Sequence, residues 1–150
     1  MNELDKNIVH FIKKHHVFNL AVCNHEKIWT ASCFYAFWNE KNALVFLSDD
    51  ETQHAKMMMQ NPVVAGTIAL ETRIIGKIQG LQFTGMVEKA ENESLAMAKK
   101  IYYKRFPYAL GTQSTFWILT LHYAKLTDNR LGFGKKIIWQ LNKTEKPILK

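Results

Sequence analysis

Hydroxyl and imidazole side chains in one short segment have the types and spacing that bind an anion. Ser48 ends an apolar run, and Thr52 and His54 open a stretch with helical periodicity. A strand-to-helix junction exposes backbone N–H groups at the positive end of the helix dipole. The hydroxyls of Ser48 and Thr52 and the ring of His54 can complete an anion site there, and Lys56 can add charge. The segment therefore predicts a phosphate site.

The same segment also fits a helix start that binds no ligand, because side chains of the segment itself can satisfy the first backbone N–H groups. Thr52 has a side chain suited to the N-cap position. Asp49, Asp50 and Glu51 can offset the positive helix end themselves, an effect of about 0.3–1 kcal/mol each at the surface. They would also repel a phosphate unless their side chains turn away. Residue types alone leave both interpretations open.

Other segments carry weaker chemical signals. The chain has no G-x-S-x-G, H-E-x-x-H or Walker A motif. Residues 132–136 resemble a phosphate loop but lack its glycine spacing, so we interpret them as a turn before an edge strand. Cys23 and Cys33 fit small buried hydrophobic residues, and the adjacent His15 and His16 fit a surface pair. We assign no metal ligands and no catalytic residue.

Composition and charge indicate one globular domain with an anionic partner. The chain has 150 residues and is 47% hydrophobic. Residues 99–150 hold 11 basic side chains and only Asp128 and Glu145 as acids. A basic half suits nucleic acid, a membrane surface or a phosphorylated ligand. No apolar run is long enough to span a membrane, and the first residues do not resemble a signal peptide, so we expect a cytoplasmic protein.

The periodicity predicts a mainly β fold with flanking helices. Short connections between successive strands favour antiparallel pairing, and the elements do not alternate as βαβ units. We therefore expect a small β-barrel. The expected helices are 3–15, 52–60 and 92–106, with Asn92 as the cap of the last; the expected strands are 17–23, 28–38, 43–48, 63–70, 81–89, 116–126 and 136–141, followed by a loose tail at 142–150.

Three segments resemble the pyridoxamine 5′-phosphate oxidase-like split-barrel superfamily. Phe46–Pro62 resembles its phosphate-binding element, Trp29–Phe37 its strand along the flavin ring, and Leu81–Glu88 its Q-x-x-x-G strand. Arg105–Pro107 and Thr127–Trp139 resemble a YhbP-like uncharacterised family within it. The resemblance spans about residues 5 to 141. It implies a six-stranded antiparallel split barrel that binds FMN, in a homodimer whose ligand site lies at the interface.

The resemblance also carries over site residues, with two departures. Gln53 and His54 stand where the oxidases have an Arg-Lys pair, and residues 29–37 lack the oxidases' ring-side Arg and Lys. Both departures argue against pyridoxamine 5′-phosphate oxidation itself. The cofactor-binding residues implied are Ser32, Cys33, Phe34, Leu47, Ser48, Thr52, Gln53, His54 and Gln82.

Four functions follow as hypotheses. The first is a flavin-dependent oxidoreductase of a small-molecule substrate, and the second is a flavin binder without catalysis. The third is a haem binder, with His10, His15, His25 or His122 as axial ligand. The fourth is nucleic-acid binding through Lys99–Arg105, which interleaves cations with tyrosines. We expect FMN and a second copy of the chain as partners, and neither nucleic acid nor a membrane.

Overall fold

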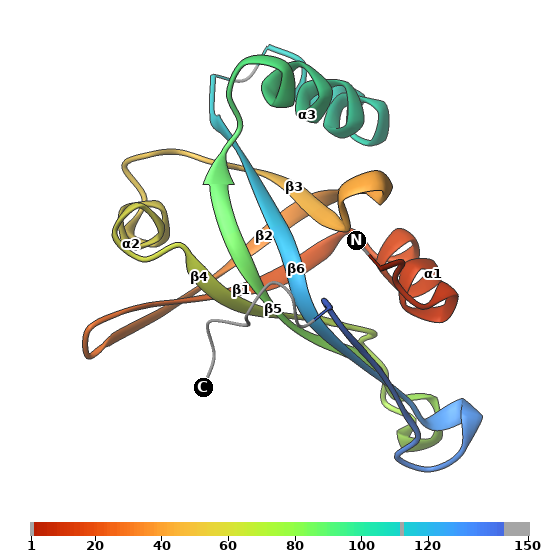
Figure 1. Ribbon diagram of the computed structural model, residues 1–150. Coiled ribbons are helices and arrows are strands. Elements are labelled where there is room, and N and C mark those ends of the chain that lie inside the picture. Colours follow the sequence, from red (N-terminus) through yellow and green to blue (C-terminus); the bar gives the residue numbers. More distant parts are fainter. Residues whose placement is uncertain (1, 112, 143–150) are drawn as a thin grey trace.

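A computed structural model describes residues 2–111 and 113–142 as a β-barrel with helices around it (Figure 1). The strands pair antiparallel in the order β3-β2-β1-β4-β5-β6-β7, and an additional pairing of β3 with β6 closes six of them into a barrel. The six-stranded antiparallel barrel expected from the sequence is thereby confirmed, with β7 as an extra strand on β6. The elements are α1 (Lys6–Lys14), β1 (Val17–Asn24), β2 (Lys27–Trp38), β3 (Ala43–Ser48), α2 (Gln53–Gln60), β4 (Val63–Ala69), β5 (Gln79–Lys89), α3 (Asn92–Arg105), β6 (Thr115–Asp128) and β7 (Lys136–Gln140).

The inward-pointing side chains of the strands fill the barrel. On β5, Leu81, Phe83 and Val87 are buried while Gln82 is exposed, as a strand with one wet face requires. Phe18 lies at the centre, edge-on to Phe46 at a ring-centroid distance of 5.2 Å. Side chains therefore occupy the interior, and any ligand must bind on the outside of the barrel or at its ends.

The three helices cover different parts of the barrel. Apolar side chains of α1 and α2 join the same core as the inward side chains of the strands, from opposite sides of the barrel (Figure 1). Helix α3 packs instead on the outer side of β2, β3 and β6, where Tyr102 contacts Phe116. The outward side chains of β1 have no such cover and are exposed or half-buried. One side of the barrel wall is therefore open.

Several local expectations need correction. Helix α1 begins at Lys6 because the Asp5 side chain accepts a hydrogen bond from Asn7 N–H and caps it. Glu91, not Asn92, is the N-cap of α3. Helical spacing predicts that Ala55, Met58 and Met59 share one face of α2, but the face turned to β1 and β2 buries Met57 and leaves Met59 exposed.

The cysteines and the histidine pair also differ from expectation. Cys23 is exposed, since it lies near the end of the β1–β2 hairpin, whereas Cys33 is buried as expected. His15 is not a free surface side chain, because its ring packs against Phe11 in a tilted arrangement at a ring-centroid distance of 4.3 Å and its Nε2 is buried. The tail expected at 142–150 lies, beyond residue 142, outside the described residues. No described helix is both long and apolar enough to cross a bilayer.

Candidate functional site

The junction between β3 and α2 brings four of the expected site residues together: Ser48, Thr52, Gln53 and His54, here named the phosphate cradle. The Ser48 Oγ contacts His54 Nε2, and Thr52 Oγ1 lies 3.4 Å from each of these atoms. Gln53 and His54 are the first two residues of α2, where backbone N–H groups have no partner within a helix. Two hydroxyls, an imidazole and the helix start thus converge.

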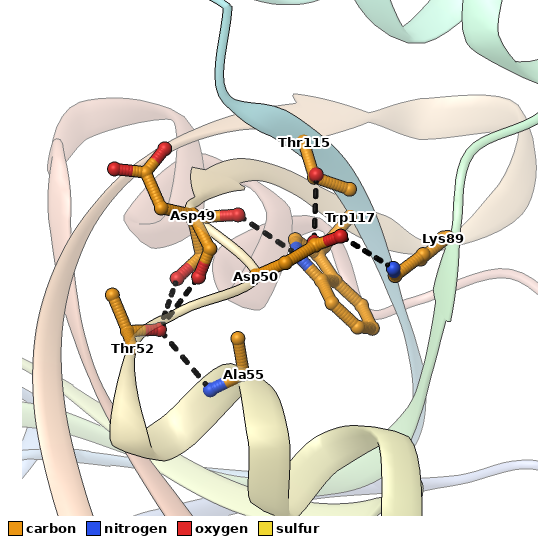
Figure 2. A network of polar contacts seen from close by, with 8 residues as sticks. Asp49, Asp50, Thr52, Ala55, Lys89, Thr115 and Trp117 are labelled. Carbon is orange, nitrogen blue, oxygen red and sulfur yellow. Dashed lines mark hydrogen bonds and ion pairs between the residues drawn. The ribbon is translucent and has the colours of Figure 1, made fainter.

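Thr52 is the helix cap that the second interpretation of the sequence described. Its Oγ1 accepts a hydrogen bond from Ala55 N–H at 3.2 Å and donates one to the Asp49 carbonyl at 2.8 Å (Figure 2). A hydroxyl has one proton to donate, and Thr52 gives it to the Asp49 carbonyl. A phosphate, which accepts hydrogen bonds, would therefore compete with that carbonyl for the proton, while the cap to Ala55 N–H could stay in place.

The two aspartates of the junction are held by residues at the end of β5 and at the start of β6. Asp50 forms an ion pair with Lys89 at 2.9 Å and accepts a hydrogen bond from Thr115 at 2.8 Å (Figure 2). The bond from Lys89 is the main cause that lowers the pKa of Asp50. Asp49 accepts a hydrogen bond from Ser114 Oγ at 2.7 Å. The repulsion of a phosphate by these carboxylates is thereby reduced.

The lysines near the cradle already pair with carboxylates of the same chain. Lys56 lies 3.7 Å from Glu51, an exposed pair of small energetic value, and Lys89 is with Asp50. Burial lowers the pKa of His54, so its ring is neutral at pH 7 in the free protein. The cradle therefore offers a phosphate hydrogen-bond donors and a dipole rather than a permanent cation.

Two further expected residues, Ser32 and Gln82, lie on the open wall of the barrel, in one row with Asn19 and Thr67, which the sequence did not single out. Ser32, Asn19, Thr67 and Gln82 are successive cross-strand neighbours on β2, β1, β4 and β5. Directly opposed residues share a face, so this polar row runs straight across four strands, and Ser32 donates a hydrogen bond to Asn19 at 2.9 Å. A groove of about 400 Å³ lies along the row and is lined by Gln82. We call this surface the outer row.

The remaining expected residues flank these two groups. The Phe34 side chain is 59% exposed on the outward side of β2. Cys33 points into the core, where burial raises the pKa of its thiol to about 11, so it can offer a ligand only its backbone. Leu47 is half-buried against the cluster under α3. Trp117, which the sequence did not single out, fixes the cradle by donating from Nε1 to the Ser48 carbonyl at 3.2 Å (Figure 2).

The cradle and the outer row face in different directions. The Ser48 side chain points inward at the end of β3, as Phe46 does, whereas Gln82 points outward from β5. Gln82 lies three strands away from Ser32 along the row. We call the cradle and the outer row the two half-sites.

The residues of the alternative hypotheses are not assembled into sites. The four candidate haem ligands lie apart: His10 and His15 on or beside α1, His25 in the β1–β2 turn and His122 on β6. For nucleic acid, Tyr102 is buried and both it and Tyr103 pack on Phe116, so neither ring is free to stack on a base. The Arg105 guanidinium donates to the Lys13 carbonyl at 3.1 Å and is not a free cation.

Solved structures share this fold at low sequence identity. A heme binding protein from Mycobacterium smegmatis has a TM-score of 0.72 at 17% identity over 87% of this chain, which spans 55% of that protein. A FAD-binding protein from Mesorhizobium loti has 0.64 at 13% identity, covering 82% and 94% of the two chains. A proposed pyridoxamine 5′-phosphate oxidase from Listeria innocua has 0.65 at 15%, covering 81% and 96%. The split-barrel fold expected from the sequence is thereby confirmed.

Sequence relatives are closer. No family model matches the chain. A UPF0306 protein of Photorhabdus laumondii is 42% identical over 134 residues, which are 89% of this chain and 94% of that protein. A UPF0306 protein of Yersinia pestis is 37% identical over 129 residues, 86% of this chain and 88% of that protein. The narrower YhbP-like grouping stays a prediction. With this identity over nearly its whole length, the chain belongs to the UPF0306 family.

Proposed function

We propose that this protein binds FMN and acts as a flavin-dependent oxidoreductase on a small substrate. The cradle is the observation that carries the proposal, because it gathers donors for a phosphate at a helix start while Asp49 and Asp50 are tied elsewhere. A bound flavin would supply hydride and electron transfer, and the chain's own residues would hold and orient it. Flavin-binding and haem-binding neighbours of the same fold support a cofactor of this kind.

Each half-site has a part of the ligand that it fits. Backbone N–H groups at Gln53 and His54, with the Ser48 and Thr52 hydroxyls, suit the phosphate. The Gln82 amide and the groove beside it suit the edge and face of a flat ring system, since an amide can both donate and accept. Because Ser48 points inward at the end of the barrel and Gln82 points outward from its wall, we propose that the two half-sites at one ligand come from two copies.

A homodimer with a shared site is therefore part of the proposal. A two-fold axis makes every contact reciprocal, so the outer row of each copy would face the ligand held by the other's cradle. The uncovered wall of β1, with exposed Val17 and Phe34 beside the row, is the surface available for it. Light scattering should give a dimer at micromolar concentration. A monomer both with and without FMN would contradict the shared site.

Replacing Thr52 by Ala should weaken FMN binding by about 1–2 kcal/mol, the usual cost of losing a hydrogen bond to a charged group. Loss of the N-cap also destabilises α2, so Thr52→Ser is the matched control because it keeps the hydroxyl. Calorimetric titration with FMN and with riboflavin separates the effects. Riboflavin has no phosphate and should be indifferent, whereas equal losses for both ligands would make Thr52 a cap only.

The affinity for FMN should rise as pH falls, through His54. In the free protein burial keeps the pKa of His54 below its ordinary value of 6.5, and a dianionic phosphate beside the ring raises it in the complex. Protonation is then coupled to binding between the two pKa values, and the gain is lost as pH rises above the pKa in the complex. The phosphate of FMN itself titrates at about pH 6.

His54→Gln isolates the contribution of the histidine, since glutamine cannot take up a proton. FMN titrations of both proteins between about pH 6 and 8.5 should show the steeper dependence for the wild-type protein. Parallel curves would mean that His54 does not sense the phosphate.

Haem is the second candidate ligand, because the fold is shared with a heme binding protein. The separated histidines do not favour it. The absorption spectrum decides between the two ligands: a Soret band on adding haem, with no response to FMN, would replace the flavin proposal.

A further inference from the structure

Two loops form a projecting tip at the end of the barrel that lies far from the cradle. Residues 70–78 connect β4 to β5, and residues 129–135 connect β6 to β7. They lie side by side at the lower right of Figure 1, beyond the barrel wall. The function proposed above uses neither loop.

Hydrogen bonds hold the two loops together. Asn129 donates from its backbone N–H to the Ile78 carbonyl and from Nδ2 to the Ile75 carbonyl, each at 3.0 Å, and its Oδ1 accepts from Gly134 N–H at 3.0 Å. Arg130 bonds to the buried Asp128 at 3.0 Å and to the buried Gln79 at 3.2 Å. The tip is therefore a braced structure rather than two independent loops.

The braced loops hold apolar side chains out in water. Phe133 is 86% exposed between Gly132 and Gly134, whose φ values of 133° and 72° favour glycine. On the facing loop Ile75 is 66% exposed. Ile74, Ile78 and Leu131 are exposed as well. Neighbouring exposed apolar side chains on a soluble domain mark a surface that contacts a protein or a membrane.

Cations surround this apolar group. The tip and the first residue of β7 carry Arg73, Lys77, Arg130, Lys135 and Lys136, all exposed, and the exposed acid of the two loops is Glu71. Among the ion pairs of the described residues, only Arg130 of these five faces a carboxylate. Nucleic acid would match the charge but leave the isoleucines and Phe133 without a partner. An anionic lipid surface matches both.

We infer that the tip docks on membranes that contain anionic lipid. Phe133 and the isoleucines enter the boundary between headgroups and acyl chains, while the lysines stay at the level of the lipid phosphates. The bracing by Asn129 and Arg130 places these side chains before contact and so lowers the ordering cost of binding. This inference differs from the sequence-based expectation that no membrane is a partner, and it does not depend on flavin binding.

Co-sedimentation of the full-length protein with lipid vesicles tests it. The wild-type protein should sediment with phosphatidylcholine vesicles that contain phosphatidylserine, and far less with phosphatidylcholine alone. Lys135→Gln combined with Lys136→Gln should weaken binding by about 30-fold, from roughly a fivefold loss per cation. Phe133→Ser should weaken it about tenfold or more. Each variant should keep its fold, because the altered side chains are exposed.

Matched variants elsewhere remove the same charge or apolar area. Lys99→Gln combined with Lys100→Gln, on α3, and Leu110→Ser, at a site 66% exposed, should leave vesicle binding unchanged. Equal losses in the tip and α3 variants, or no dependence on phosphatidylserine, would overturn the inference. Tip substitutions that break the dimer yet leave vesicle binding intact would instead assign the tip to a contact between copies.

Discussion

Gly85→Ala is expected to lower the free energy of unfolding by about 3 kcal/mol, the upper range for forcing an atom into a packed core. Gly85 is buried on β5 at the point where the pairing with β6 shifts register. A Cβ there would collide with the Thr120 carbonyl and would lie 2.8 Å from Leu119 Cδ2. The carbonyl belongs to a barrel strand and cannot move aside without breaking the pairing, so the strain stays in the native state.

Gly80→Ala on the same strand is the matched control. The nearest atom to a Cβ at that position is the Ile68 carbonyl oxygen at 3.9 Å, an ordinary contact. Both substitutions reduce the entropy of the unfolded chain alike, so the difference between them reports the collision. Urea unfolding followed by circular dichroism measures it. Equal stabilities for the two variants would show that β5 and β6 can shift to accommodate a Cβ at Gly85 without a loss of stability.

Charged substitutions at Gln53 are expected to change FMN affinity and the stability of α2 in opposite directions. The side chain is exposed at the first position of α2, where the related oxidases carry a cation according to the sequence resemblance. Gln53→Lys should tighten FMN binding by about tenfold, because one charge near a dianionic phosphate contributes about 1–2 kcal/mol in water. Gln53→Glu, nearly the same size, should weaken it by about tenfold for the same reason.

The helix dipole predicts the reverse order for stability. Glu at the first turn stabilises a helix and Lys destabilises it, each by about 0.3–1 kcal/mol. Thermal unfolding without ligand measures the effect on stability. Calorimetry with FMN and riboflavin measures the effect on ligand affinity. The difference in FMN affinity between the two variants should shrink in high salt. If both variants bind FMN like the wild-type protein, the phosphate does not lie at the start of α2.

The sequence predicted the barrel well because its signals are local. The side-chain periodicity that predicts each helix and strand depends on a few neighbouring residues, and each element was found within a few residues of its expected bounds. The cradle was predictable for the same reason, since Ser48 and His54 are six residues apart and a strand-to-helix junction joins them.

Contacts between distant segments were not predictable. Nothing in the spacing shows that Lys89 and Thr115 hold Asp50, or that Trp117 holds the Ser48 carbonyl, because barrel closure between β3 and β6 brings those residues together. The spacing also does not show that Ser48 points into the barrel while Gln82 points out of its wall, because that depends on how the strands pair.

The most direct test of the account is the absorption spectrum of the purified protein, followed by titration with FMN and with riboflavin. The account predicts a flavin spectrum, or saturable binding of one FMN per chain to a dimer, with riboflavin bound more weakly because it lacks the phosphate held by Ser48, Thr52 and His54. Binding of riboflavin as tight as that of FMN, or no binding of either, would contradict it.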